Sequence, residues 1–163
     1  QPHRLRSLVT IAAPLTPVSR RQRWTKTYPL ALIYRLVGPN RLITKALFDT
    51  LFGPKAIAAQ PDRAAQMMNA FNAADRESIR RTIRFMHHWH ALTDKLPAVI
   101  VPTLLMTGDL PDQQWQPADE QAAAAAMPRA RAVAVTGAGH LGPLLLDVDL
   151  IAATVGEFWR SLP

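Results

Sequence analysis

Cysteine is absent from the 163 residues of this chain. Its absence excludes disulfide scaffolds, zinc sites with cysteine ligands, iron–sulfur clusters and thiol nucleophiles. The sequence also lacks any run near the ~20 consecutive apolar residues that a membrane-spanning helix needs. The chain is 48% hydrophobic and 19% charged, a balance typical of proteins that fold around an apolar core. Its length predicts a single domain.

The first ten residues, QPHRLRSLVT, lack the long apolar core of a secretory signal. We therefore expect a cytoplasmic protein. The chain opens on Gln1 instead of methionine, and we expect this start to be a cut within a longer sequence.

Acidic residues are absent from residues 1–48, which carry nine lysines and arginines. Such a basic arm can bind nucleic acid or an anionic membrane, because contacts to phosphates release counterions. A solvated, arginine-rich surface is the alternative. We favour the solvated surface because Arg20, Arg21 and Arg23 form the only tight cluster and no nucleic-acid motif accompanies them. We expect neither a nucleic-acid nor a membrane partner.

The first half of the chain predicts one strand followed by helices. The apolar run SLVTIA at residues 7–12 is followed by APLTPVS, which predicts a buried strand that ends in a loop. Between residues 28 and 53, apolar side chains recur at helical spacing and are punctuated by GPN and GP, which predicts two amphipathic helices. Residues 62–74 and 75–92 continue the helical period, with Asp75 as the expected N-cap of the second stretch.

The second half of the chain alternates strands and helices. Residues 100–108 and 130–137 are apolar runs that end in glycine, and residues 118–127 between them predict a helix. Residues 148–162 predict a closing helix. Its expected inner side carries Ile151, Val155, Phe158 and Trp159. This alternation predicts parallel strands with helices on both faces, an α/β fold. Three strands make a small sheet, and we expect that half of the sheet lies outside this chain.

Ionisable side chains follow two of the predicted strands, at the sheet edge where open parallel sheets bind ligands. The loop after the second strand carries Asp109 and Asp112, and the loop after the third carries His140 between glycines. A histidine there can approach a substrate closely, and a carboxylate from the adjacent loop can accept its ring N–H. Such a pair is the base half of a nucleophilic triad. The alternative is a loop histidine near a solvated aspartate by chance.

Three segments resemble one known family. In order, PHRLRSLVTIAAP, VPTLLMTGDLPDQQWQP and ARAVAVTGAGHLGPLLLD resemble the sixth, seventh and eighth strands of α/β-hydrolase fold enzymes, with the acid loop after the seventh and the histidine loop after the eighth. The resemblance covers nearly the whole chain. It implies an α/β fold in which residues 1–17 are a sixth-strand segment, residues 18–96 an inserted helical cap and residues 97–163 the C-terminal part of the hydrolase core.

The resemblance implies that His140 and Asp112 are catalytic. The family's acid usually lies three residues after the strand-ending glycine, and this chain has Pro111 there. We favour Asp112 because it stands three residues before Trp115, as in the tryptophan-bearing variant of this loop. Asp109 is the alternative.

The nucleophile is absent from the sequence, because no G-x-S-x-G turn occurs and none of the four serines lies on a predicted strand-to-helix turn. The resemblance implies ester or related acyl-bond hydrolysis of a small-molecule substrate by a Ser-Asp-His triad completed by the N-terminal half of the sheet, in the same gene or as a partner chain. An aspartate nucleophile would instead give epoxide hydrolase or dehalogenase chemistry. The fragment alone would be inactive, and no metal or organic cofactor is implied. The alternative is a non-catalytic, truncated binding module that uses the basic arm.

Two further clusters have competing interpretations. The histidines around Trp89 could bind a metal or could lie on a partly exposed helix, which we favour because no acid or thiol stands at matching spacing; they are His87, His88 and His90. A set of methionines and aromatic residues could line a substrate pocket or form an ordinary core stripe, and we favour the core; its members are Met67, Met68, Phe71, Phe85, Met86 and Trp89.

Overall fold

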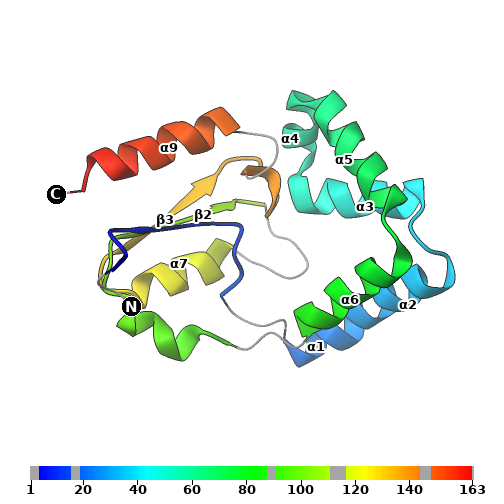
Figure 1. Cartoon of the computed structure of the whole chain (residues 1–163), viewed down its shortest axis with the longest axis horizontal. Helices are drawn as coiled ribbons and strands as arrows, with labels where there is room; N and C mark the ends of the chain where they lie inside the picture. Colours follow the sequence, from blue (N-terminus) through cyan, green and yellow to red (C-terminus); the bar gives the residue numbers. More distant parts are fainter. Residues whose placement is uncertain (1–3, 16–18, 88–90, 111–116, 144–147, 163) are drawn as a thin grey trace.

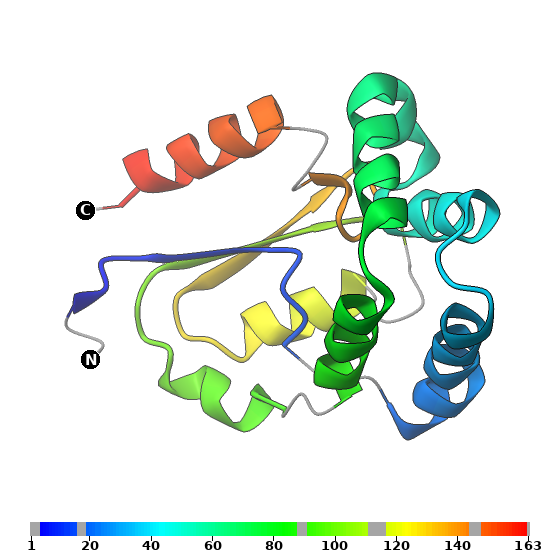
Figure 2. The same ribbon diagram turned by 45° about the vertical axis from the view of Figure 1, so that its right-hand side comes forward.

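The computed structural model describes residues 4–15, 19–87, 91–110, 117–143 and 148–162 (Figure 1). In this part of the chain a small parallel sheet lies between two helices, and a group of helices lies beyond one end of the sheet (Figures 1 and 2). The α/β fold expected from the sequence is confirmed.

The sheet contains the three expected strands, β1 (Leu8–Ile11), β2 (Thr103–Gly108) and β3 (Ala130–Val135). All pairs are parallel and the order is β1-β2-β3, so that Thr103 in the middle strand pairs with Leu8 on one side and Ala130 on the other. β2 begins three residues later than expected, directly after Pro102. Proline has no N–H to donate to a ladder, and its carbonyl accepts the N–H of Leu8 at 2.9 Å.

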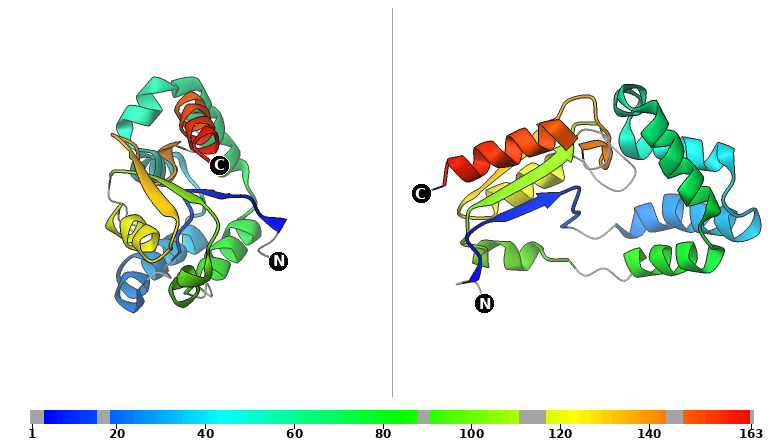
Figure 3. Two further views of the ribbon diagram at one scale, coloured as in Figure 1. Left: turned by 90° about the vertical axis from the view of Figure 1, so that its left-hand side faces the viewer. Right: turned by 45° about the horizontal axis from the view of Figure 1, so that its top comes forward.

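The central strand β2 is buried on both faces. Successive side chains of a strand point to opposite sides, and here Leu105 packs toward α7 (Pro117–Ala125) while Leu104 and Met106 pack toward α9 (Val148–Arg160). All three side chains have no exposed surface. Figure 3 shows the two helices on opposite sides of the sheet. The expectation of helices on both faces is therefore confirmed.

One side chain of α9 points the other way from the expectation. Ile151, Val155 and Phe158 pack against the sheet, whereas Trp159 is 58% exposed. The expected inner position of Trp159 was therefore wrong. Consecutive helix residues are about 100° apart, and because Phe158 occupies the centre of the inner stripe, its neighbour is turned toward solvent.

The helices between β1 and β2 form an insertion, residues 20–87, which lies beyond the carboxyl ends of the strands (Figure 3). Its elements are α1 (Arg20–Gln22), the π-helical turn η2 (Arg23–Thr27), α2 (Tyr28–Leu36), α3 (Arg41–Phe52), α4 (Pro54–Ala59), α5 (Pro61–Ala73) and α6 (Arg76–His87). A 3₁₀ helix, η3 (Thr93–Ala98), leads back to β2. The four expected helices correspond to α2, α3, α5 and α6; α1, η2, α4 and η3 were not expected.

Local chemistry explains where these helices begin and end. Pro54 and Pro61 are the first residues of α4 and α5. Proline is favoured there because an N–H at the first helical position has no partner within the helix, so its absence costs no hydrogen bond. The side chain of Asn40 accepts the N–H of Ile43 at 3.0 Å and so caps α3. Gly53 ends α3 with a φ of 82°, a conformation that favours glycine.

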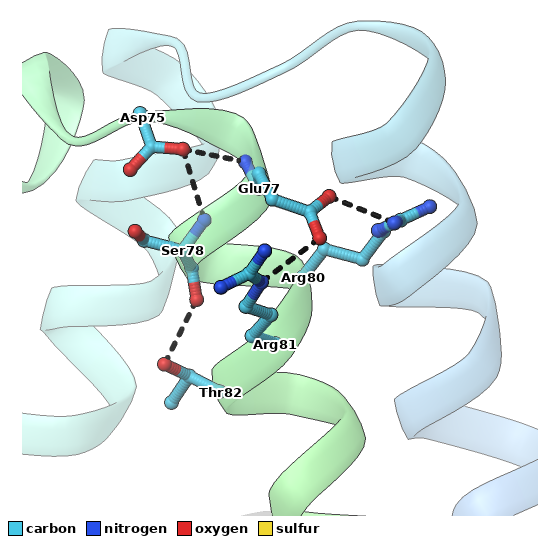
Figure 4. A network of polar contacts seen from close by, with 6 residues as sticks. All are labelled: Asp75, Glu77, Ser78, Arg80, Arg81 and Thr82. Atoms are coloured by element: carbon cyan, nitrogen blue, oxygen red, sulfur yellow. Dashed lines mark hydrogen bonds and ion pairs between the residues drawn. The ribbon is translucent and has the colours of Figure 1, made fainter.

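The start of α6 confirms the expected N-cap (Figure 4). One carboxylate oxygen of Asp75 accepts the N–H groups of Glu77 at 2.9 Å and Ser78 at 3.0 Å. Glu77 in turn pairs with Arg80 at 2.8 Å and Arg81 at 3.0 Å. The bonds to Ser78 lower the pKa of Asp75, and the hydrogen bonds from Arg80 and Arg81 lower the pKa of Glu77.

The insertion has its own apolar cluster, separate from the two clusters that cover the sheet. Phe48, Phe52 and Ala64 are buried in it. The rings of Phe48 and Phe52 lie 4.9 Å apart, and Phe71 meets Phe48 edge-on at 6.0 Å. Met67, Met68 and Phe71 pack against this cluster, which is the core stripe that we favoured for them. Phe85 does not fit that interpretation, because it is 71% exposed; the side chains of Met86 and Trp89 lie outside the described residues.

Candidate active site

The candidate site is built around the loop that follows β3, residues 136–143, here called the β3 loop. Its His140 side chain is buried, with 9% of its surface exposed. The loop leaves the sheet at the carboxyl ends of the strands, the edge that faces the insertion (Figure 1). The sequence-predicted histidine is thus placed at the edge where open parallel sheets bind their ligands.

The end of β2 braces the β3 loop through hydrogen bonds. The Asp109 carboxylate accepts the N–H of Gly137 at 2.7 Å. The backbone N–H groups of Asp109 and Leu110 donate to the carbonyls of Val135 and Ala138, each at 3.1 Å. The loop that carries the candidate acids and the loop that carries the histidine are therefore joined side by side.

A glycine makes this close approach possible. A Cβ added to Gly108, the last residue of β2, would overlap the backbone of Ala138 and Gly139. The β3 loop therefore crosses directly over the end of β2. Gly137 also has a φ of 75°, which lets the loop turn sharply after the strand.

The insertion holds the other side of the β3 loop. The N–H of Gly139 donates to the carbonyl of Phe52, and the N–H of Leu141 donates to the carbonyl of Leu51, both at 2.8 Å. These two acceptors are in the last turn of α3. His140 therefore sits in a segment that is bonded to the sheet on one side and to the insertion on the other.

The two candidate acids have different standing in the structure. Asp109 is half-buried and its carboxylate accepts a bond from the β3 loop, which gives it a bracing role. Asp112 falls in residues 111–116, outside the described residues. The choice of Asp112 as the acid stays a prediction, as do the catalytic roles of His140 and the boundaries at residues 18 and 96.

None of the four serines is placed as a strand-to-helix nucleophile. Ser7 precedes β1, Ser19 precedes α1 and Ser78 lies within α6. Ser161 follows α9, and its hydroxyl donates to the carbonyl of Phe158 at 2.7 Å. None of these four hydroxyls therefore lies on a turn from a strand into a helix, and a nucleophile outside this chain stays a prediction.

Sequence reasoning missed several groups near this edge. Lys55 at the start of α4 extends over Gly137, with its Nζ 3.4 Å from the carbonyl of Thr136. Glu120 in the first turn of α7 is 1% exposed, where helix N–H groups favour a carboxylate. The helical pattern of the sequence does not indicate which of the two neighbouring acidic side chains, Asp119 or Glu120, is buried. The carbonyls of α3 carry no sequence signal at all, although Gly53 marks the helix end that presents them.

Within the part of the chain that the structure describes, no three histidine, aspartate or glutamate side chains gather as a metal site. The histidines proposed as an alternative metal cluster are not testable there, because the His87 side chain and residues 88–90 lie outside the described residues. Likewise, none of the helices in the described ranges combines the length and the apolar character needed to cross a membrane.

Comparison with known proteins identifies the fold. No protein-family model and no curated protein matches the sequence. Among solved structures, a thermophilic esterase from Thermogutta terrifontis matches 99% of this chain and 58% of its own, with a TM-score of 0.79 and 22% identity. The enol-lactonase from Burkholderia xenovorans LB400 matches 97% of this chain and 57% of its own, with a TM-score of 0.78 and 21% identity.

A third similar structure names the class to which this fold corresponds. MGS-M2, an α/β-hydrolase enzyme from a Medee basin deep-sea metagenome library, matches 97% of this chain and 57% of its own, with a TM-score of 0.75 and 15% identity. The chain thus has the α/β-hydrolase fold, in the form of the C-terminal part of its parallel sheet with helices inserted. It spans a little under three fifths of the length of these structures.

Proposed function

We propose that this chain is the C-terminal part of a hydrolase that cleaves an ester or a related acyl bond of a small molecule. One observation carries the proposal. The β3 loop holds a buried histidine at the carboxyl end of the sheet and is hydrogen-bonded to the aspartate-bearing loop of the neighbouring strand. The fold supports it, because similar structures include an esterase and an enol-lactonase.

In the proposed reaction His140 moves the protons. A serine oxygen from outside this chain bonds to the acyl carbon while its proton passes to the ring of His140. The ester C–O bond then breaks, and the leaving oxygen takes that proton. A water oxygen then bonds to the acyl carbon while a water proton passes to His140. The bond between the acyl carbon and the serine oxygen breaks, and the serine takes that proton. Asp112 would hold the ring in the tautomer that accepts the proton and would stabilise its charged form.

The missing part of the site would come from the sheet beyond β1. The N–H groups of Leu8 and Ala12, at the two ends of β1, donate to the carbonyls of Pro102 and Met106 on the β2 side. Among the described residues, no strand pairs with the other edge of β1. A further parallel strand on the open side would bring the turn that bears the nucleophile. We propose that this part is supplied by the same gene or by a partner chain, and that the present chain alone is inactive. The cytoplasmic location expected from the sequence stays a prediction.

We further propose that the insertion is the cap of the complete enzyme and shapes its substrate pocket. It lies beyond the carboxyl ends of the strands, on the side where the β3 loop leaves the sheet (Figure 2). If the missing nucleophile is an aspartate, the same histidine would activate water against an alkyl-enzyme, as in epoxide hydrolase or dehalogenase chemistry.

The coding sequence upstream of Gln1 tests the proposal first. A G-x-S-x-G turn between a strand and a helix supports acyl hydrolysis, and an aspartate at the same place supports alkyl chemistry. If the upstream sequence has neither motif, the enzyme proposal is overturned. In the longer protein, His140→Ala should lower kcat for aryl esters by roughly 10³–10⁶-fold. Asp112→Asn should lower kcat by about 10⁴-fold, and Asp109→Asn should do so only if the acid is misassigned.

A second candidate function is binding of polyanions by the basic arm. Arg20, Arg21 and Arg35 are exposed, and the rings of Trp24 and Tyr28 lie edge to face 5.0 Å apart on the same helical stretch, with Trp24 66% exposed. Exposed aromatic rings among arginines are what single-stranded nucleic acids bind.

Titration with a fluorescent single-stranded oligonucleotide at several salt concentrations tests this second candidate. If the arm binds, affinity falls steeply with salt, and Arg21→Ala reduces the salt slope by about one. Binding that is absent at low salt, or independent of salt, rejects it.

A further inference from the structure

The residues on both sides of His140 are held by one helix end. Gly139 and Leu141 donate their N–H groups to the carbonyls of Phe52 and Leu51, each at 2.8 Å. The last carbonyls of a helix have no partner within the helix. At the end of α3, two of these carbonyls are satisfied by the β3 loop, which comes about 90 residues later in the chain.

Three glycines allow the loop and the helix to touch backbone to backbone. A Cβ on Gly139 would overlap the carbonyl of Leu51, and a Cβ on Gly53 would lie 2.8 Å from the nitrogen of Gly139. Gly142, two residues after the histidine, is equally close, because its Cβ would lie 2.5 Å from the carbonyl oxygen of Phe52. Side chains at these positions would force the two segments apart.

The side chain after the histidine adds an apolar anchor. Leu141 packs against the cluster of Phe48, Phe52 and Ala64 in the insertion. Its side chain therefore belongs to the core of the insertion, although the residue itself belongs to the β3 loop. Leu141 is itself half-buried, so this contact adds apolar packing beside the hydrogen bond that its N–H donates to Leu51.

We propose that the last turn of α3, Leu51–Gly53, with Leu141 as its anchor, is a positioning element for His140. The sheet fixes the loop before the histidine, through Asp109 and Gly137, and the insertion fixes it on either side of the histidine. The place of the imidazole then depends on how the insertion sits on the sheet. As a statement about catalysis, this inference rests on the proposed function: a cap that closes around a substrate would also position the catalytic base, His140.

The first test uses the full chain and needs no activity. Leu141→Ala should speed hydrogen exchange of the Gly139 and Leu141 amides by tenfold or more and shift the ring signals of His140 in NMR spectra. Met67→Ala is the matched control, because it removes an apolar side chain from the same cluster but from α5. It should leave the two amides and the ring signals unchanged.

A second pair of variants tests the close approach itself. Gly139→Ala should displace the loop and give the same changes at His140. Gly156→Ala in α9 is its control, because the added Cβ would meet only Arg160, at 3.5 Å. The proposal is overturned if neither Leu141→Ala nor Gly139→Ala changes the His140 signals, or if Met67→Ala changes them equally.

Kinetics of the longer protein then separate this inference from the proposed function. Leu141→Ala should lower kcat at least tenfold with KM changed less than twofold, and Leu141→Met, which conserves side-chain volume, should restore most of it. If His140→Ala leaves activity intact, the proposed function fails. If His140→Ala abolishes activity while Leu141→Ala does not alter kcat, only the positioning role fails.

Discussion

Strands β1 and β2 have similar sequences but opposite environments. Both are short apolar runs, LVTI and TLLMTG, and both predict buried strands. Every residue of β2 is buried, whereas no residue of β1 is, and all four are partly exposed. The difference shows that an apolar composition predicts a strand that is stabilised by burial. Whether this chain buries the strand depends on the position of the strand in the sheet.

The open side of β1 is where the two strands differ most. β2 has a partner strand on each side and a helix on each face. β1 has a partner on one side only, among the described residues. An apolar edge strand is a template for further pairing, and this is the edge at which we place the rest of the sheet. Variants in the two strands should therefore respond differently to the further strands that we propose.

The largest effect is expected from Leu104→Ala in β2. The side chain has no exposed surface, and such truncations cost about 2–5 kcal/mol of unfolding free energy. Val9→Ala in β1 is the matched comparison, because Val9 packs against the same cluster but is partly exposed. In this chain it should cost less than about 1.5 kcal/mol, the lower end of what burying such a side chain contributes.

Urea denaturation of both variants measures the contrast, and repeating it in the longer protein sharpens the comparison. There the cost of Val9→Ala should rise toward that of a buried valine, while the cost of Leu104→Ala should stay the same. Equal losses for the two variants in this chain would show that β1 is already as well buried as β2.

Gly108→Ala should have the next largest effect. The added Cβ would overlap the backbone of Ala138 and Gly139, and relief of such overlaps typically costs about 1–3 kcal/mol. Gly156→Ala in α9 should instead stabilise the protein by up to about 1 kcal/mol, because alanine favours a helix interior. Thermal unfolding of the two variants should shift in opposite directions; a neutral Gly108→Ala would mean that the β3 loop does not cross the end of β2 as closely as described.

Asn40→Ala should cost about 1 kcal/mol, the usual loss for an N-cap side chain. The bond that disappears joins Asn40 to the N–H of Ile43 at the start of α3. Hydrogen exchange should quicken in the first turn of α3 and stay unchanged in β2. Asn40→Ser, which keeps a capping oxygen, is the control and should recover most of the loss.

Sequence patterns predicted the sheet and its covering helices well. Continuous apolar runs, with proline and glycine near their ends, mark the strands, and the parallel arrangement follows from the strand–helix alternation. Trp159 shows the limit of this reasoning. The helical pattern of the sequence assigns both adjacent aromatic residues of α9 to the apolar stripe. Only the packing of Phe158 against the sheet decides which of the two is buried.

The candidate site was predictable only in part, because its histidine has a side-chain signature and its supports do not. GAGH after an apolar run indicates His140. Nothing in the sequence indicates that the carbonyls of Leu51 and Phe52 reach the β3 loop, because backbone acceptors are the same at every residue. Asp109 carries a side-chain signal, but the bond that it makes to Gly137 depends on two loops meeting in three dimensions.

The smallest effect concerns the acidic start of α6, where stability should depend on pH. The pKa of Asp75 lies below its ordinary value of 3.8 and that of Glu77 below 4.5, because hydrogen bonds favour both charged carboxylates. A carboxylate whose pKa is lower in the folded state contributes stability above its unfolded pKa and loses it as pH falls through the folded pKa. Protection of the α6 amides should therefore be constant above about pH 5 and decrease on further acidification. Both side chains are exposed, so salt should reduce the effect.

Asp75→Asn separates the cap from the charge in this region. Asparagine caps a helix about as well as aspartate, so the variant should keep the α6 amides protected at neutral pH and lose the share of the pH dependence that comes from Asp75. The pH dependence that remains should belong to Glu77 and should disappear in Glu77→Gln. The unfolding cost of Leu104→Ala, by contrast, arises from apolar burial and should be the same at pH 4 and pH 7. A pH-dependent cost for Leu104→Ala would mean that the centre of the sheet and the edge of the insertion are energetically coupled.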